Sequence, residues 1–341
     1  MKKILNYIFF SFLIYLSIIV ILELIFGDWL KSNNFGYAVR EHRNVNIPMS
    51  VEYEGKKYDY VFKRNNYGFI GEEINPQNTE IVFLGGSTGE EMFKPYNYSI
   101  VGRLNEKLKD DKFEFEIINA STGGKSTRGY VNDFNFWFSK IENFDPKIYI
   151  FYIGLNDASL SLPGHFDEPI KKNNIEKIED YIKNNSIFYQ VKKKIENKYF
   201  NELRTYYGLK KKDLYNNFNF INYESAVTKF YKTELDNKKK TILENFSQNL
   251  NNLKNIIQTK NIHPIFITQI KFDGLNDHSL FLVNEYLKKF CEKNKFDIIR
   301  LDEMKYILDS KDFYDQFHTT LKGSEKISSL IYPQLIKYLT N

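Results

Sequence analysis

The chain has 341 residues, of which 42% are hydrophobic and 27% are charged. This composition excludes a largely disordered protein, and the length allows one large domain or two modest ones. The net charge of +5 is mildly basic, but no nucleic-acid recognition module accompanies the lysine clusters at residues 192–194, 210–212 and 238–240. We therefore expect solvated helix faces and no nucleic-acid partner. Cys291 is the only cysteine, which excludes an intrachain disulfide and a zinc site built on cysteines.

The N-terminal segment is almost purely apolar from residue 4 to residue 26. At about 1.5 Å per residue, such a helix crosses a hydrocarbon core of about 30 Å. A cleaved signal peptide is the alternative, but the run ends without a small-x-small cleavage site, which favours an uncleaved anchor. Lys2 and Lys3 precede the run, so we expect a single-pass membrane protein with a cytoplasmic N-terminus and an extracytoplasmic remainder.

Strand and helix patterns follow the anchor in a regular order. Residues 28–79 predict an irregular lead-in with a hairpin, because residues 51–53 and 58–62 alternate on either side of a turn. Alternating strands and helices then begin at residue 80. The predicted strands are 81–84, 113–118, 147–153, 264–268 and 298–301, and the predicted helices include 100–108, 130–141, 241–259, 279–293 and 321–339.

This alternation predicts an α/β fold, a flavodoxin-like three-layer sandwich around a parallel sheet. Residues 158–237 interrupt it with a Lys-, Asn- and Tyr-rich stretch that shows helical patterns and no clear strand, so we expect a helical insertion. The predicted organisation is a transmembrane anchor at 1–27, a lead-in segment at 28–79 and one domain at 80–341 that contains the insertion.

Polar residues stand at the ends of the predicted strands, where open parallel sheets bind their ligands. Ser87 lies in a Gly-Gly-Ser-Thr-Gly turn after the first strand, and a helix start beyond it would direct N–H groups at a developing anion. Asp315 and His318 are three residues apart after the last strand. An aspartate at that spacing can fix the tautomer of the imidazole, which can then take a proton from a serine.

These blocks, with Asn119-Ala-Ser-Thr-Gly-Gly and Gly154-Leu-Asn-Asp between them, resemble the SGNH (GDSL-like) hydrolases. The Asn66-Tyr-Gly-Phe-Ile-Gly stretch before them is similar to the lead-in of membrane-anchored bacterial members. The resemblance implies that Ser87 is the nucleophile and that Asp315 and His318 complete the catalytic residues. It further implies an oxyanion hole formed by Ser87, Gly124 and Asn156. One departure is visible: the family often has Gly-Asp-Ser where this chain has Gly86 before the serine, and the same turn accommodates both.

Each motif alone has an ordinary interpretation. A Gly-x-Ser-x-Gly turn also occurs in α/β-hydrolases, and Ser87 could be a helix N-cap. Asn156 could be a loop residue that bonds its own backbone, and Asp157 is expected to brace its loop. The other histidines, His42, His165, His263 and His278, have no acidic partner at a useful spacing.

The sequence thus predicts a serine esterase that removes acyl groups, O-acetyl first among them, from an envelope glycan or lipid and needs no cofactor. Two alternatives stay open: an O-acyltransferase that acts on polysaccharide with the same residues, and a non-catalytic glycan-binding or assembly protein with a relic site.

Overall fold

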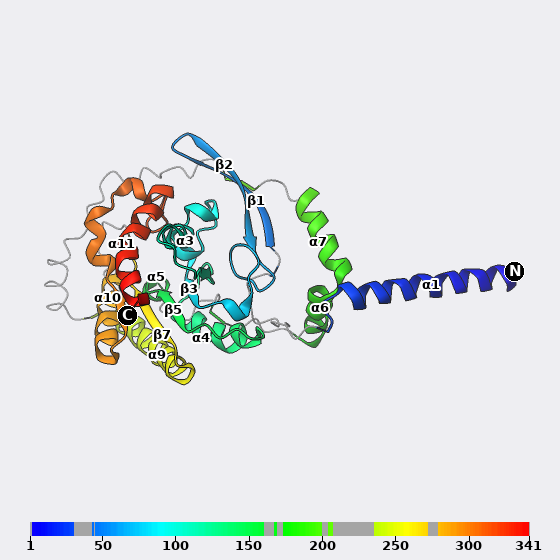
Figure 1. Ribbon diagram of the computed structural model, residues 1–341. Helices are drawn as coiled ribbons and strands as arrows, with labels where there is room; N and C mark the ends of the chain where they lie inside the picture. Colours follow the sequence, from blue (N-terminus) through cyan, green and yellow to red (C-terminus); the bar gives the residue numbers. More distant parts are fainter. Residues whose placement is uncertain are drawn as a thin grey trace.

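The computed structural model describes residues 2–30, 43, 45–159, 167–168, 173–199, 204–206, 235–271 and 279–340. At its centre lies a parallel five-stranded sheet (Figure 1). Its strands are β3 (Ile81–Gly85), β4 (Ile117–Asn119), β5 (Ile148–Tyr152), β7 (His263–Ile267) and β8 (Asp297–Ile299). Their spatial order is β4-β3-β5-β7-β8, in which the second core strand lies outside the first. The predicted flavodoxin-like sheet is therefore confirmed.

Helices cover both faces of this sheet. One face carries α4 (Thr127–Phe136), α9 (Asn237–Lys260) and α10 (Ser279–Asn294), and the other carries α3 (Ile100–Asp110) and α11 (Leu321–Thr340). Successive strand residues point to opposite faces, so Val82 and Leu84 pack on the first layer whereas Ile81 and Phe83 pack on the second. The three-layer arrangement follows from strands that are apolar on both sides.

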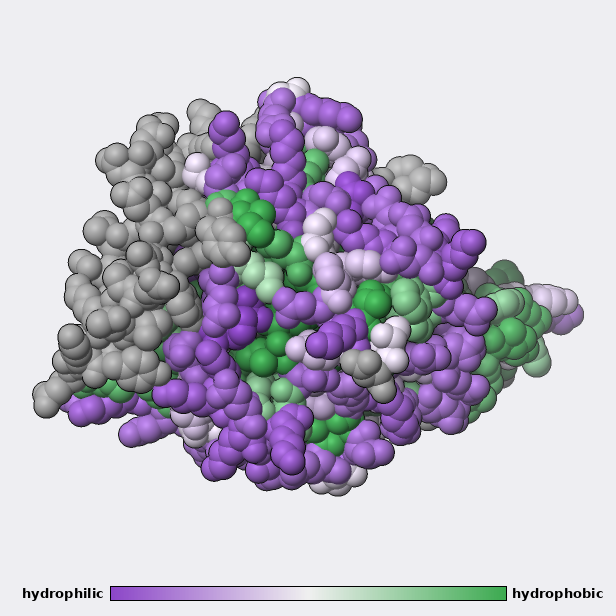
Figure 2. Space-filling view, turned by 60° about the vertical axis from the view of Figure 1, so that its left-hand side comes forward, coloured by the Kyte–Doolittle hydropathy of each residue, from purple (hydrophilic) through white to green (hydrophobic). Residues whose placement is uncertain are grey.

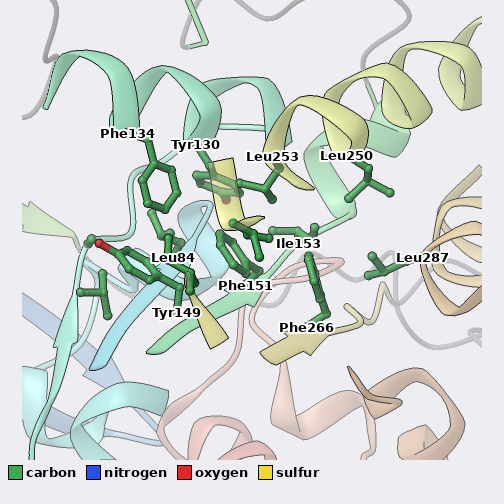
Figure 3. Close-up of a cluster of buried hydrophobic side chains, with 14 of the residues drawn as sticks. Leu84, Tyr130, Phe134, Tyr149, Phe151, Ile153, Leu250, Leu253, Phe266 and Leu287 are labelled. Carbon is green, nitrogen blue, oxygen red and sulfur yellow. The ribbon is translucent and has the colours of Figure 1, made fainter. Parts of the chain in front are cut away.

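The first of these layers is rich in aromatic side chains. Figure 3 shows Tyr130 and Phe134 of α4 lying over the sheet residue Tyr149, with Phe151 and Phe266 beside them. Phe134 and Tyr149 have ring centroids 4.9 Å apart, and Phe151 stacks on Phe266 at 5.1 Å. The core on this face of the sheet is thus held together in part by close packing between aromatic rings.

Short helical segments follow two of the strands and occupy several loops. They are α2 (Ser87–Glu90), α5 (Leu155–Ser159) and the 3₁₀ turns Pro76–Asn78, Tyr96–Tyr98, Phe138–Lys140, Leu301–Ile307 and Ser310–Asp312. The helix expected beyond Ser87 has only four residues, because Glu91 adopts a left-handed conformation with φ 48° and ends it. Helix α4 begins earlier than predicted, at Thr127, where the Ser126 side chain accepts a hydrogen bond from the Arg128 amide.

The predicted hairpin is present as β1 (Val45–Tyr53) and β2 (Lys56–Arg64). Its two turn residues, Glu54 and Gly55, have φ values of 51° and 78°, as a two-residue hairpin turn requires. A third strand, β6 (Arg204–Tyr206), pairs in parallel with β1. The expectation of no strand in residues 158–237 was wrong: a three-residue strand is too short to show alternation, and tertiary pairing decides its conformation.

Helix α1 (Lys2–Phe26) projects from the rest of the protein (Figure 1) and ends beside α6 (Asn174–Asn185) and α7 (Ile187–Tyr199). None of its most apolar stretch is buried in the protein. Figure 2 shows this helix as a hydrophobic projection at the right, next to a largely hydrophilic surface. By length and composition α1 is able to cross a membrane, and a signal sequence passes the same test.

Candidate active site

Ser87 lies where strand β3 turns into α2, at the carboxyl edge of the sheet. The residue before it, Gly86, is closely approached by Asn156: a Cβ atom at position 86 would lie 2.4 Å from Asn156 Nδ2. No side chain fits there unless Asn156 moves. The departure from Gly-Asp-Ser that the sequence shows therefore has a physical reason in this chain, since the glycine leaves room for the Asn156 amide.

Asp315, His318 and Ser87 form a continuous series of hydrogen bonds. His318 Nε2 lies 2.8 Å from Ser87 Oγ, and His318 Nδ1 lies 2.6 Å from Asp315 Oδ2. Burial raises the pKa of the Asp315 carboxyl, but hydrogen bonding to His318, the charge of that ring and two backbone N–H groups outweigh it and hold the pKa below its usual value. Asp315 is thus a carboxylate at neutral pH and an acceptor for an Nδ1–H group.

The loop that carries His318 is held against the serine turn by a buried polar cluster. Lys94 is 2% exposed, and its Nζ contacts Glu91 Oε1 at 2.7 Å, Thr319 O at 2.6 Å and Ser324 Oγ at 2.6 Å. Glu91 directly follows α2, and Thr319 directly follows His318. The cluster therefore fixes the imidazole relative to Ser87 through groups that are fully desolvated and mutually paired.

Gly124 and Asn156 reach the same edge from the loops after β4 and β5. Gly124 has φ 80°, which favours glycine. The neighbouring Gly123 N–H donates to Glu90 Oε2 at 3.0 Å, whereas the Gly124 N–H has no acceptor among the described residues. Asn156 Nδ2 donates to Lys125 O at 2.7 Å. An amide nitrogen carries two hydrogens, so this bond fixes the side chain and leaves one donor.

Gln269 is a site residue that the sequence analysis missed. It follows β7, and its side chain donates to Thr88 Oγ1 at 2.7 Å and accepts from the Leu155 N–H at 2.6 Å. It thereby joins the residue after Ser87 to the residue before Asn156. Its position just beyond the fourth core strand is the signal that could have identified it, by the same rule that singled out the other strand ends.

The sequence analysis also missed a contact between the hairpin and α2. Arg64, at the end of β2, donates to Glu90 Oε1 at 2.6 Å and to Ser121 O at 3.0 Å. Glu90 in turn holds the Gly123 amide. The hairpin thus helps to set the conformation of the Gly-rich loop, which no local sequence pattern around residues 56–64 indicates.

Asp157 is buried and connects the Asn156 loop to the start of α4. It accepts hydrogen bonds from the Thr127 N–H at 3.2 Å and from Thr127 Oγ1 at 3.1 Å, which is the bracing role expected from the sequence. Burial, with the Asp167 carboxylate nearby, raises the pKa of Asp157 to about 7, against the lowering effect of the Thr127 hydrogen bonds. Asp157 is therefore a group whose charge in the folded protein changes near neutral pH.

This raised pKa predicts a pH-dependent effect of Asp157→Asn. The folded state binds the proton more tightly than the unfolded state, so the contribution of Asp157 to stability is present at acidic pH and is lost as the pH rises through about 7. Asparagine removes this dependence. We expect the free energy of unfolding of Asp157→Asn, relative to the parent, to rise by about 3 kcal/mol from pH 5 to pH 8. Urea unfolding at both pH values measures it, and a constant difference would contradict the assignment.

His263 has a partner that sequence spacing did not reveal. Its Nε2 lies 2.6 Å from Asp297 Oδ2, so the expectation that His263 lacks an acidic partner was wrong. The two residues begin the neighbouring strands β7 and β8 and lie at the amino edge of the sheet, opposite to Ser87. The expectations for His42, His165 and His278 lie outside the described residues. Within the described ranges no cluster of three His, Cys, Asp or Glu side chains is placed to hold a metal ion.

The parallel sheet with helices on both faces and the polar groups at its carboxyl edge fit a carboxylic ester hydrolase, which is the class that the family match gives. Residues 81–331 match the family model described as GDSL-like lipase/acylhydrolase, and the chain belongs to this family. The resemblance found in the four sequence blocks is therefore confirmed. No curated protein matches the chain in sequence.

Several solved structures are similar to this chain at low sequence identity. An acetyl xylan esterase, AlAXEase, is 14% identical with a TM-score of 0.41, covering 74% of this chain and 98% of its own. The esterase EstA from Pseudoalteromonas sp. is 13% identical with a TM-score of 0.42, covering 77% and 100%. The lipase/acylhydrolase from Enterococcus faecalis is 14% identical with a TM-score of 0.43, covering 75% and 95%.

Proposed function

We propose that Ser87, His318 and Asp315 form a catalytic triad that hydrolyses acyl esters. The observation that carries this proposal is the pair of hydrogen bonds through His318, 2.8 Å to Ser87 Oγ and 2.6 Å to Asp315 Oδ2. With Nδ1–H directed at the Asp315 carboxylate, Nε2 is free to accept the Ser87 proton. A serine hydroxyl is a weak nucleophile until such a base removes its proton.

The reaction proceeds in two steps. Ser87 Oγ attacks the ester carbonyl while its proton moves to His318 Nε2. The tetrahedral intermediate then collapses, and the same proton goes to the departing alcohol. Water, activated by His318, attacks the acyl-enzyme, releases the carboxylic acid and restores the Ser87 hydroxyl. Asp315 remains ionised throughout and stabilises the imidazolium, in agreement with the direction of its pKa.

Three donors are proposed to hold the oxyanion of the intermediate: the backbone N–H groups of Ser87 and Gly124 and the side-chain amide of Asn156. Ser87 is the first residue of α2, so its N–H has no acceptor within that helix. The Gly124 N–H has no acceptor within the described ranges, and Asn156 has a donor left after its bond to Lys125 O. Fixed donors of this kind stabilise the charge as it develops.

Asn156→Ala tests the side-chain donor. We expect kcat to fall by about 10²–10³-fold with KM nearly unchanged, because the hydrogen bond strengthens as the carbonyl oxygen becomes an anion. Steady-state kinetics with p-nitrophenyl acetate measures both constants. The exposed helix residue Asn251, replaced by alanine, is the matched control. An unchanged kcat for Asn156→Ala would remove this residue from the oxyanion hole.

The proposed substrate is an acyl ester, with O-acetyl as the first candidate, on an envelope glycan or lipid. The support is the ester hydrolase family together with helix α1, which we propose to be a membrane anchor that leaves the domain outside the cytoplasm. The proposed boundaries are residues 1–27 for the anchor, 28–79 for the lead-in and 80–341 for the hydrolase domain with its insertion at about 158–237. Protease protection on intact cells tests the orientation, which is wrong if the C-terminus is shielded.

Two measurements on the detergent-solubilised protein test the function. A fluorophosphonate probe should label Ser87, which a relic binding site would not permit. Isolated envelope polymers should release acetate without any added acceptor. If acetyl groups left the polymer only when a sugar acceptor was supplied and were then found as esters of that sugar, the protein would be an acyltransferase, and the hydrolytic half of the proposal would be overturned.

A further inference from the structure

Helices α6 and α7 expose an apolar surface that the proposed hydrolase chemistry does not use. Beyond Leu30, most of the exposed large hydrophobic side chains of the described residues lie on these two helices. They are Ile175, Ile178, Tyr181, Ile182, Phe188, Val191 and Ile195. Ile175 is 78% exposed and Ile178 is 61% exposed. A group of exposed apolar side chains on two successive helices of an otherwise polar surface is typical of an interaction site.

The spacing of these residues places them in one stripe along each helix. On α6 the isoleucines at 175, 178 and 182 are three and four residues apart, and on α7 the same spacing relates Phe188, Val191 and Ile195. Most of the remaining positions hold charged or amide residues, including the lysines at 192–194. Each helix is thus amphipathic, as helices that lie in a membrane interface are.

The junction between α6 and α7 is fastened to the last turn of α1. Glu23 Oε1 accepts a hydrogen bond from Ser186 Oγ at 2.5 Å, and Glu23 Oε2 accepts one from the Ile187 N–H at 3.0 Å. Just beyond α1, the Asp28 N–H donates to Asn185 O at 2.8 Å. These bonds fix the start of α7 at the point where the apolar helix ends.

Trp29 and Tyr181 form an aromatic pair close to the end of α1. Trp29 Nε1 donates to Glu23 Oε2 at 2.7 Å, and the Trp29 ring meets Tyr181 of α6 edge-on with centroids 5.6 Å apart. Tryptophan and tyrosine are typical of the boundary between hydrocarbon and water. In the view of Figure 1, α7 runs across the direction of α1, so that a membrane crossed by α1 would extend along α7.

We propose that α6 and α7 form a foot that lies in the headgroup region of the bilayer that α1 spans, with the two apolar stripes facing the lipid. This inference rests on the proposed membrane anchor. The sequence of α7 contains more lysine than acidic residues, and anionic headgroups attract basic segments next to a membrane. The foot holds the hydrolase domain at a fixed height and orientation above the bilayer. Its substrate esters are therefore those displayed close to the membrane surface.

Fluorescence quenching in vesicles tests the foot. Single cysteines at Val191→Cys in the stripe of α7, Glu196→Cys off the stripe and Leu16→Cys within α1 are labelled with the fluorophore NBD; native Cys291 is fully buried and stays unlabelled. The whole chain is reconstituted in phosphatidylcholine–phosphatidylglycerol vesicles that contain lipids with a nitroxide on the upper acyl chain. Circular dichroism melts show that each variant is folded.

We expect strong quenching at positions 16 and 191 and at least threefold weaker quenching at position 196. Quenching at 16 without quenching at 191 overturns the foot and leaves the anchor standing. A label at 191 that is shielded from aqueous iodide but not quenched by the lipid nitroxide overturns the foot in favour of a protein partner. If position 16 is not quenched either, the proposed anchor fails, and the foot fails with it.

Discussion

Replacing Ser87 by alanine is expected to lower kcat for p-nitrophenyl acetate by on the order of 10⁶-fold, the loss that removal of a serine nucleophile produces. His318 cannot compensate, because without the hydroxyl there is no group at 2.8 Å from Nε2 that can form the acyl-enzyme. The residual rate should come from the oxyanion donors and from binding alone. Labelling by a fluorophosphonate should be lost in parallel.

Ser87→Ala should leave the fold intact. An inactive but stably folded variant would show that Ser87 is needed for catalysis and not for stability. The N-cap of α2 is Gly86 and no side chain caps this helix, so the alternative that Ser87 is a helix cap was wrong. Removal of the hydroxyl should therefore change the unfolding free energy by only about 1 kcal/mol. Ser139, an exposed serine whose hydroxyl donates to the backbone carbonyl of Asn135, is the matched control, and Ser139→Ala should keep the parental kcat. Parental turnover in Ser87→Ala would remove Ser87 as the nucleophile.

The sequence was sufficient to predict the sheet and the positions of the main polar groups, because both depend on local patterns. Buried parallel strands are short apolar runs, and Ser87 and Asn156 each lie directly after one of them. Asp315 and His318 could be paired from sequence because they are only three residues apart. The contact between His318 and Ser87 spans 231 positions, so no local pattern indicates it. It was expected from the family resemblance and from the rule that such strands place their carboxyl ends together.

The missed residues share a different property: their partners are distant in sequence and belong to no repeating pattern. Gln269 lies 181 positions from Thr88, and Lys94 lies 225 positions from Thr319. Lysines are mostly exposed, so a local interpretation treats Lys94 as an ordinary surface residue. For Gln269 the only local signal is its position after a core strand. In the folded protein both side chains are buried and hydrogen-bonded. Whether a polar side chain becomes buried depends on how complete helices and strands pack together.

Asp315→Asn is expected to lower kcat by about 10⁴-fold while the site keeps its shape. The reason lies in how the carboxylate is held. Asp315 Oδ1 accepts the N–H groups of Phe317 at 2.9 Å and of His318 at 2.7 Å, so an asparagine keeps its oxygen in this place. Its NH₂ group then points at His318 Nδ1. The imidazole must accept that hydrogen bond and carries its own proton on Nε2, where it can no longer take the proton of Ser87.

Asp297→Asn is a control of matched chemistry, because Asp297 contacts His263 at the same 2.6 Å as Asp315 contacts His318. That pair lies at the amino edge of the sheet, so its substitution should leave kcat unchanged. Nitrogen NMR of the His318 ring provides an independent measurement, in which Asp315→Asn should move the ring proton from Nδ1 to Nε2. If both substitutions slowed the reaction equally, loss of stability would explain the effect and Asp315 would have no special role. A large loss confined to Asp315→Asn, together with the changed tautomer, would assign the loss to the position of one proton.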